Sequence, residues 1–229
     1  MKLSIIIPVY NEIQTIEALL GRVREISAGR DVETIVVDDG STDGTTEYLQ
    51  TYNNEQTKII SLTNNQGKGN AIRTAIPHAT GDAVAVQDAD LEYDPEELFA
   101  LLKILETESL PAIYGSRFLG TRTGMTTSST IGNRGLTAAM NLLFRTSLTD
   151  LCTCFKMVRR DILCTLPLQS TGFEFCAEVT AHLAKRNVPI REVPITYHAR
   201  SRSQGKKIRW SDGVISLFTL IRCRFSPLS

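Results

Sequence analysis

The sequence predicts an α/β fold in which a mostly parallel, mixed sheet is flanked by helices. Through the first 115 residues, short apolar runs alternate with segments whose apolar residues recur at helical spacing. This alternation is typical of parallel strands joined by right-handed helical crossovers. The 229 residues, 42% of them hydrophobic, suffice for one globular domain with a sizeable core. No internal repeat, low-complexity tract or linker interrupts the chain, so we expect a single domain over 1–229.

In the first half, each expected strand is a short apolar run, and each expected helix has apolar residues three or four positions apart. The expected strands are Leu3–Pro8, Glu33–Val37, Lys58–Leu62, Ala83–Val86 and Ala112–Tyr114. The expected helices are Ile13–Ile26, a segment starting at Asp43 or Thr45, Ala71–Ala79, and Glu96–Leu105 after Pro95.

After Gly115 the pattern changes. Thr121–Thr130 contains five threonines and is expected to form a loop. Strands are expected at Cys154–Val158 and Val188–Ile195, and helices at Ile131–Leu143, Phe173–Arg186 and Ile208–Phe225. The last of these is amphipathic and has basic residues at both ends.

The charges balance in number but not in position. Lys+Arg and Asp+Glu both total 25, so the net charge gives no indication of nucleic-acid binding. Basic residues gather between Arg200 and Lys207 without an acid, whereas acids gather at Asp38–Asp39 and from Asp88 to Glu97. A basic segment facing an acidic site suits an anionic substrate.

Neither a leader nor a membrane-spanning helix is expected. The apolar run Leu3–Val9 is too short for a signal peptide and has no cleavage site, and no stretch of 18 apolar residues exists. The five cysteines include the pair Cys152 and Cys154, but no second pair or nearby histidine completes a zinc site there. We expect reduced thiols in a cytosolic protein.

Asp88-Ala89-Asp90 places two carboxylates one residue apart, just after an expected buried strand. Like charges that close raise each other's pKa, and a divalent cation relieves the repulsion. Hard cations such as Mg²⁺ prefer oxygen ligands that they share with substrate phosphates. Open α/β sheets bind ligands beyond the carboxyl ends of their strands. The motif therefore indicates a metal–diphosphate site, although a surface turn also produces it.

Polar segments follow the other expected strands as well. In Pro8–Glu12, Tyr10 can stack on a base and Glu12 can accept from it, or the segment simply begins a helix. The acids of Asp38–Ser41 can hold a base or a ribose hydroxyl, or form an Asx-turn. Gly67–Gly69 resembles half of a phosphate loop but lacks the ending of a Walker motif.

Together and in this order, these segments resemble the family-2 glycosyltransferases with a GT-A fold. The segments are Pro-Val-Tyr-Asn-Glu (8–12), Val-Val-Asp-Asp-Gly-Ser-Thr-Asp-Gly-Thr (36–45), Asn-Gln-Gly-Lys-Gly-Asn-Ala (65–71) and Gln-Asp-Ala-Asp-Leu-Glu (87–92). The second half is similar to the polyprenyl-phosphate branch, which includes dolichol-phosphate mannose synthases and bacterial glucosyl relatives. Its segments are Tyr-Gly-Ser-Arg-Phe (114–118), Asp-Leu-Cys-Thr-Cys-Phe-Lys (150–156), Gly-Phe-Glu-Phe (172–175), and Val-Pro-Ile-Thr-Tyr-His-Ala-Arg with Gly-Lys-Lys (193–207).

The resemblance implies a role for each part of the chain. Residues 1–115 would bind a nucleotide-sugar, 116–207 an acceptor, and 208–229 would form a C-terminal helix that contacts a membrane. The implied nucleotide-sugar ligands are Pro8, Tyr10, Glu12, Val37, Asp39, Asp88, Ala89, Asp90, Arg117, Arg200 and Lys206. The implied metal ligands for Mg²⁺ or Mn²⁺ are Asp88, Asp90 and Glu92, where Glu92 replaces a glutamine of some relatives.

The catalytic residues implied by the resemblance are Asp90 and Arg117, and the acceptor phosphate would contact Arg117, Arg134 and Lys207. Arg200 and Lys206 match a basic pair of the family at a spacing of six, and Lys207 is a rival to Lys206 by a slip of one residue. The family's pattern Arg…Gly-x-Ser-Lys is matched only in part by this sequence.

The implied reaction is the metal-dependent, inverting transfer of a hexose from GDP-mannose or UDP-glucose to a polyprenyl monophosphate, dolichyl or undecaprenyl. A lipid monophosphate is ionised at neutral pH and attacks without a base, whereas a sugar hydroxyl needs one. Arginines suit the task of holding it in line because their planar fork matches phosphate oxygens. Direct attack on an α-linked donor gives a β-linked product.

Two other functions stay open. A family-2 transferase acting on a sugar hydroxyl in polysaccharide synthesis would need a base, for which Asp150 or Glu174 would serve. A non-catalytic nucleotide-sugar-binding subunit would bind the donor without turnover. For the enzyme, we expect a peripheral position at the cytoplasmic face of a membrane, directly or through a membrane-anchored partner. The apolar faces of 131–144 and 208–225 would meet the lipid, unless they are core.

Overall fold

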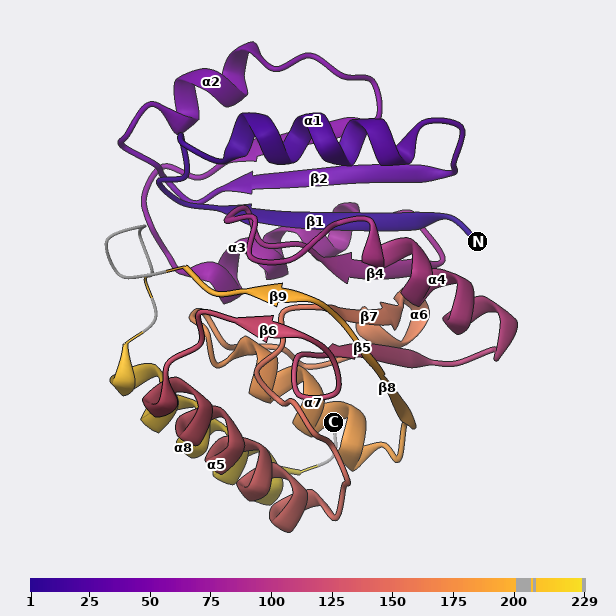
Figure 1. Cartoon of the computed structure of the whole chain (residues 1–229), viewed down its shortest axis with the longest axis vertical. Coiled ribbons are helices and arrows are strands. Elements are labelled where there is room, and N and C mark those ends of the chain that lie inside the picture. The colour runs from indigo at the N-terminus through magenta and orange to yellow at the C-terminus, as the bar shows by residue number, and fades with distance from the viewer. Residues whose placement is uncertain (201–206, 208, 228–229) are drawn as a thin grey trace.

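The structure is a computed structural model and describes residues 1–200, 207 and 209–227. A seven-stranded sheet crosses the molecule in the order β3-β2-β1-β4-β7-β5-β8 (Figure 1). Its strands are β1 (Leu3–Val9), β2 (Val32–Asp38), β3 (Thr57–Ser61), β4 (Ala83–Val86), β5 (Ala112–Ser116), β7 (Lys156–Arg159) and β8 (Ile190–Pro194). Two further short strands, β6 (Arg122–Thr123) and β9 (Tyr197–His198), pair in parallel beside it.

The helices flank this sheet. They are α1 (Ile16–Ser27), α2 (Thr45–Thr51), α3 (Lys68–Ala75), the 3-10 helix η1 (Ile76–His78), α4 (Glu97–Thr107), α5 (Thr127–Phe144), α6 (Arg160–Leu163), α7 (Phe175–Lys185) and α8 (Trp210–Phe225). Within the described part of the chain, none has the length and apolar character needed to cross a bilayer.

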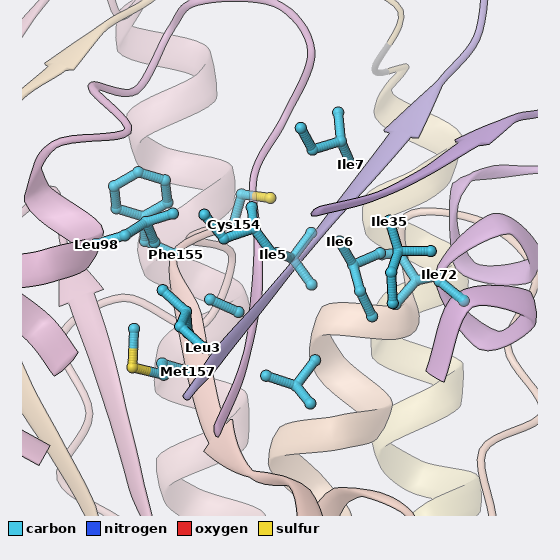
Figure 2. Packing of buried hydrophobic residues seen from close by; sticks show 14 of the residues in the cluster. Leu3, Ile5, Ile6, Ile7, Ile35, Ile72, Leu98, Cys154, Phe155 and Met157 are labelled. Carbon is cyan, nitrogen blue, oxygen red and sulfur yellow. The ribbon is translucent and has the colours of Figure 1, made fainter. Parts of the chain in front are cut away.

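The sheet is mixed, as predicted, because one strand runs against the others. β7 lies antiparallel between β4 and β5, and all other neighbours in the large sheet are parallel. The interior strand β1 is buried along its whole length, which is typical of a parallel strand covered by helices on both faces. Ile6 lies toward Ile35 and Ile72, whereas Leu3 lies toward Met157 (Figure 2). The predicted α/β architecture is therefore confirmed.

A second, smaller core lies under α8. Leu220 and Cys223 of this helix are buried together with Met140 of α5 and Ala181 of α7. α5 and α8 lie side by side at one edge of the molecule (Figure 1). The opposite face of α8 is open, with Trp210 85% and Phe218 66% exposed. Of the apolar residues in this helix, only Leu220 and Cys223 are therefore explained by core packing.

The threonine-rich segment 121–130 is more ordered than predicted. It contains β6, and α5 begins at Thr127, four residues before the expected start. The Thr126 hydroxyl accepts the backbone N–H of Ser129 at 3.2 Å and so caps the helix. The prediction of a loop was wrong because capping threonines at a helix start look like loop composition.

The Gly-Lys-Gly segment also differs from its prediction. Lys68 and Gly69 form the first turn of α3, which was expected to start at Ala71. A side chain at Gly69 would meet the carbonyl oxygen of Ser170 at 2.7 Å, and Gly67 adopts a positive φ of 99° beside Thr171. These glycines therefore allow close packing against residues 170–172, and they do not form an open phosphate cradle.

Candidate functional site

The site lies at the carboxyl edge of three neighbouring strands. β1 pairs in parallel with both β2 and β4, so the segments that follow these strands meet at one edge of the sheet. Tyr10 and Glu12 follow β1, Asp39 follows β2, and Asp88–Glu92 follows β4. This is the edge at which open α/β sheets bind ligands.

Arg200 connects three of these acids. Its guanidinium donates to both carboxylate oxygens of Glu12, at 2.9 and 3.1 Å, and to Asp90 Oδ2 at 3.1 Å. Its backbone N–H donates to Glu92 Oε1 at 2.7 Å. Among the described residues, the buried Nε of Arg200 has no hydrogen-bond partner. The structure therefore brings the predicted residues Glu12, Asp90 and Arg200 into one cluster.

Lys207, at the other end of the basic segment that begins at Arg200, also contacts Glu12. Its Nζ donates to Glu12 Oε1 at 2.6 Å and to the backbone carbonyl of Tyr10, and it lies 5.7 Å from the centre of the Tyr10 ring. Burial opposes ionisation of Glu12, but the hydrogen bonds from Arg200 and Lys207 hold the pKa of its carboxyl below the ordinary value. Lys206, the first choice for the second cation, lies outside the described residues.

The two aspartates of the Asp88-Ala89-Asp90 motif each face a cation of the protein. Lys68 Nζ lies 2.5 Å from Asp88 Oδ1, and Arg200 contacts Asp90. Burial, together with the charges of Asp88 and Glu92, raises the pKa of Asp90. Burial lowers the pKa of the Lys68 amine, but Asp88, together with Cys154 and Cys176, raises it above its usual value. Two carboxylates that need two cationic partners are a donor set of the kind that fits Mg²⁺ or Mn²⁺.

Glu92, the third predicted metal ligand, is held by protein donors. It is buried, its Oε2 accepts the Tyr197 hydroxyl at 2.6 Å, and its Oε1 accepts the Arg200 backbone N–H. These contacts connect the segment after β4 to β9. Asp90 is engaged in the same way, by the Glu92 N–H and Arg200, so the role of Glu92 as a ligand stays a prediction.

The remaining nucleotide-side residues line the same edge. Pro8 and Val37 are register partners in β1 and β2, and both are buried. Asp39 accepts the backbone N–H groups of Gln66 and Gly67 at 2.9 and 2.8 Å, so it also holds the loop before α3. The carbonyl oxygen of buried Ala89 accepts the Thr15 hydroxyl at 2.7 Å.

Arg117 is not placed to face a substrate phosphate, contrary to the prediction. It is buried, and its Nε and Nη2 donate to the two oxygens of Asp150 at 2.7 and 2.8 Å. The face of its guanidinium lies 5.0 Å from the centre of the Tyr197 ring. This pairing also engages Asp150, which is fully buried and unsuited to act as a base.

Glu174, the other base considered, is also engaged. Its Oε1 accepts the backbone N–H groups of Thr171 and Gly172 at 3.1 and 3.0 Å. Both oxygens of Asp150 are therefore engaged, whereas in half-buried Glu174 these backbone donors engage Oε1 alone.

A pair of arginines lies beside Phe118, in the part of the chain predicted to bind the acceptor. Exposed Arg134 of α5 and half-buried Arg122 of β6 lie 5.3 and 4.8 Å from the centre of the Phe118 ring. Arg134 was predicted, whereas Arg122 was missed because the segment around it was expected to be an unstructured loop. A strand with a single basic residue gives no sequence signal of its own.

Comparison with known proteins identifies the family of this chain. Residues 4–166 match the family model described as glycosyl transferase family 2. A dolichol-phosphate mannosyltransferase of Pyrococcus furiosus is 29% identical over 90% of this chain and 59% of its own length. An undecaprenyl-phosphate mannosyltransferase of Micrococcus luteus is 31% identical over 90% of this chain and 87% of its own. The chain spans only 48% to 63% of the length of the Pyrococcus and Haloferax relatives.

Solved structures agree on the fold. Glucosyl-3-phosphoglycerate synthase from Mycobacterium tuberculosis superposes with a TM-score of 0.75 over 99% of this chain and 81% of its own, at 21% identity. At that identity the likeness establishes the architecture alone.

Proposed function

Since this chain belongs to glycosyltransferase family 2, we propose that it transfers a hexose from a nucleotide-sugar to a polyprenyl monophosphate, with inversion at the anomeric carbon. The observation that carries the proposal is the pair Asp88 and Asp90 at the end of β4, each neutralised by a cation of the protein. The relatives that act as dolichol-phosphate and undecaprenyl-phosphate mannosyltransferases support this class of acceptor.

Asp88 and Asp90 would hold Mg²⁺ or Mn²⁺ together with the donor diphosphate. When bound, such an ion stabilises the negative charge that develops on the leaving nucleoside diphosphate. Lys68 and Arg200 would then turn from the aspartates toward phosphate oxygens, for which Arg200 has an Nε without a hydrogen-bond partner among the described residues. Tyr10 follows β1 at the same edge of the sheet, where its ring would stack on the base.

The acceptor phosphate would lie between β6 and α5, at Arg122 and Arg134. Two guanidinium groups beside one aromatic ring provide several donors for a phosphate dianion, and no described carboxylate forms an ion pair with either. An ionised phosphate needs no base, which agrees with the engagement of both Asp150 oxygens by Arg117. Arg117 would act as a support that holds Asp150 and Tyr197 below this region.

The exposed faces of α5 and α8 would place the enzyme on a membrane. Ile131 and Leu142 of α5 and Phe218 and Phe225 of α8 are each at least 66% exposed. Arg209, Arg222 and Arg224 flank the apolar body of α8. Apolar residues with basic neighbours are typical of helices that lie in the interface of anionic membranes. We place the protein at the cytoplasmic face.

We expect Trp210→Asp with Phe218→Asp to reduce binding to vesicles with anionic lipid by roughly tenfold or more, since two exposed aromatic side chains proposed to enter the membrane would be replaced by charges. Vesicle flotation measures the bound fraction. Gln50→Asp on α2, at the other end of the molecule (Figure 1), is the matched control and should bind normally. Equal flotation of the double variant and the control would contradict a membrane role for this face.

The test of the reaction combines purified protein and Mg²⁺ or Mn²⁺ with labelled GDP-mannose or UDP-glucose and a polyprenyl phosphate. We expect metal-dependent label in the organic phase from one donor. The names of the relatives favour mannose. Label transferred only to a sugar hydroxyl would point to polysaccharide synthesis, and donor binding without transfer would point to a regulatory subunit. Either result would overturn the proposal.

A further inference from the structure

A second group of metal-binding side chains lies between α7 and α8, away from the glycosyl-transfer site. Glu178 and His182 are one turn apart on α7, and Cys223 faces them from α8. One ligand atom from each lies within 4.8 Å of the others, and Cys223 Sγ lies 3.9 Å from His182 Nε2. The three residues thus converge on one point from two helices.

The spacing matches a tetrahedral metal centre. Zinc bonds of about 2.3 Å to sulfur and 2.0–2.1 Å to nitrogen place these two ligands roughly 3.5 Å apart. The sulfur and nitrogen therefore need to approach by only a few tenths of an ångström, and the Glu178 oxygen, which lies within 4.8 Å of both, by about 1 Å at most. Carboxylate, imidazole and thiolate together form a donor set that selects zinc over Mg²⁺, because sulfur is a soft ligand.

Neighbouring groups orient the carboxylate. Glu178 is 1% exposed, and its Oε2 accepts the backbone N–H groups of Gln169 and Ser170 at 3.0 and 2.8 Å. Its Oε1 points to Arg222 Nη2 at 3.1 Å. The Arg222 side chain is 52% exposed, so it occupies the open side of the group and has room to move into solvent. Such outer contacts are what holds ligands of real metal centres in place.

Burial acts in opposite directions on metal binding at the other two side chains, so the case for a metal rests on their geometry. Burial lowers the pKa of His182, and Lys185, Arg186 and Arg222 add to this effect against Glu178. Burial raises the pKa of the Cys223 thiol. The thiol proton would pass to solvent as the sulfur–metal bond forms.

We propose that Glu178, His182 and Cys223 form a zinc site that clamps α8 against α7, with water as the fourth ligand. The site is independent of the proposed reaction, and its role is structural. The site would hold the buried face of α8 in place, so that α8 keeps its orientation when its exposed face binds a membrane.

The test is titration of the chelator-stripped full chain with Zn²⁺ and, as a coloured substitute, with Co²⁺. We expect about one tightly bound equivalent, and with Co²⁺ an absorption band from charge transfer between thiolate and metal. Cys223→Ser should abolish the band, and His182→Gln should weaken zinc binding roughly tenfold or more. Cys164→Ser and His78→Gln remove exposed residues of the same types and should leave binding unchanged.

A further variant distinguishes loss of the zinc site from loss of the folded structure. Arg222→Gln removes the cation that competes for Glu178 and should tighten zinc binding roughly tenfold, because like charge no longer opposes the ion. Circular dichroism reports whether each variant is folded. Absence of a tight equivalent in the unmodified protein, or a thiolate band that persists in folded Cys223→Ser, would overturn the proposal. So would zinc affinity that Arg222→Gln leaves unchanged or weakens.

Discussion

Asp90→Asn is expected to lower the rate of glycosyl transfer by roughly a thousandfold, because a bound metal contributes several kcal/mol to stabilising the leaving group. Asparagine has the same size but no charge, so the variant removes one of the two proposed metal ligands without leaving a cavity. It also removes a partner of Arg200, which then contacts only Glu12 and Glu92. The substitution therefore acts on charge at the site, and the buried core is unchanged.

The measurement is the initial rate of label transfer to the lipid phosphate, with metal concentration varied. Asp94→Asn is the matched control, since Asp94 follows on the same segment but pairs with Arg22 at the surface, at 2.7 Å. We expect the control to stay within about twofold of the unmodified protein, as surface pairs contribute little. A rate for Asp90→Asn equal to that of the control would contradict the assignment of the metal to this motif.

Asp150→Ala is expected to lower the free energy of unfolding by about 3–5 kcal/mol, because it leaves the buried Arg117 guanidinium without its counter-charge. Asp150 is 0% exposed and accepts three hydrogen bonds from Arg117, from the backbone N–H at 3.1 Å and from two guanidinium nitrogens. Breaking one side of such a pair costs far more than removing a surface charge. In a chain of this length the melting temperature should fall by about 10 °C.

Urea unfolding followed by circular dichroism gives the difference directly. Asp161→Ala is the matched control, because Asp161 is 68% exposed and lies 3.5 Å from Arg159, and its cost should be below about 0.5 kcal/mol. If Asp150→Ala unfolds like the control but loses transferase activity, Asp150 acts on the substrate and the structural interpretation fails. If stability and activity fall together, the residue supports the site through Arg117.

The strands could be predicted because buried parallel strands appear in the sequence as short apolar runs. All five strands expected in the first half are present, and β1 extends only one residue beyond its prediction. The short elements β9 and α6 were not predicted, because two or four residues carry no period that distinguishes a strand or helix from a loop. The boundaries of α3 and α5 were wrong where capping residues resemble loops.

Candidate site residues could be predicted where a short motif contains them. Asp88 and Asp90 were found from their spacing, and Arg200 from the resemblance. The burial of Arg117 against Asp150 could not be predicted, because the two residues are 33 positions apart and a single charged residue is normally expected at the surface. The same holds for Glu92, whose oxygens are taken by Tyr197 and Arg200 from the other end of the chain.

The contacts of Arg200 also set an order of events during synthesis of the protein. Arg200 lies 188 positions after Glu12 and 110 after Asp90. At 5–20 residues per second, the ribosome makes Arg200 about 5–20 s after Asp90. Until then Glu12, Asp90 and Glu92 lack the counter-charge that Arg200 supplies to all three. We therefore expect a nascent or truncated chain that contains every strand of the nucleotide half but ends before Arg200 to be inactive in the transfer assay.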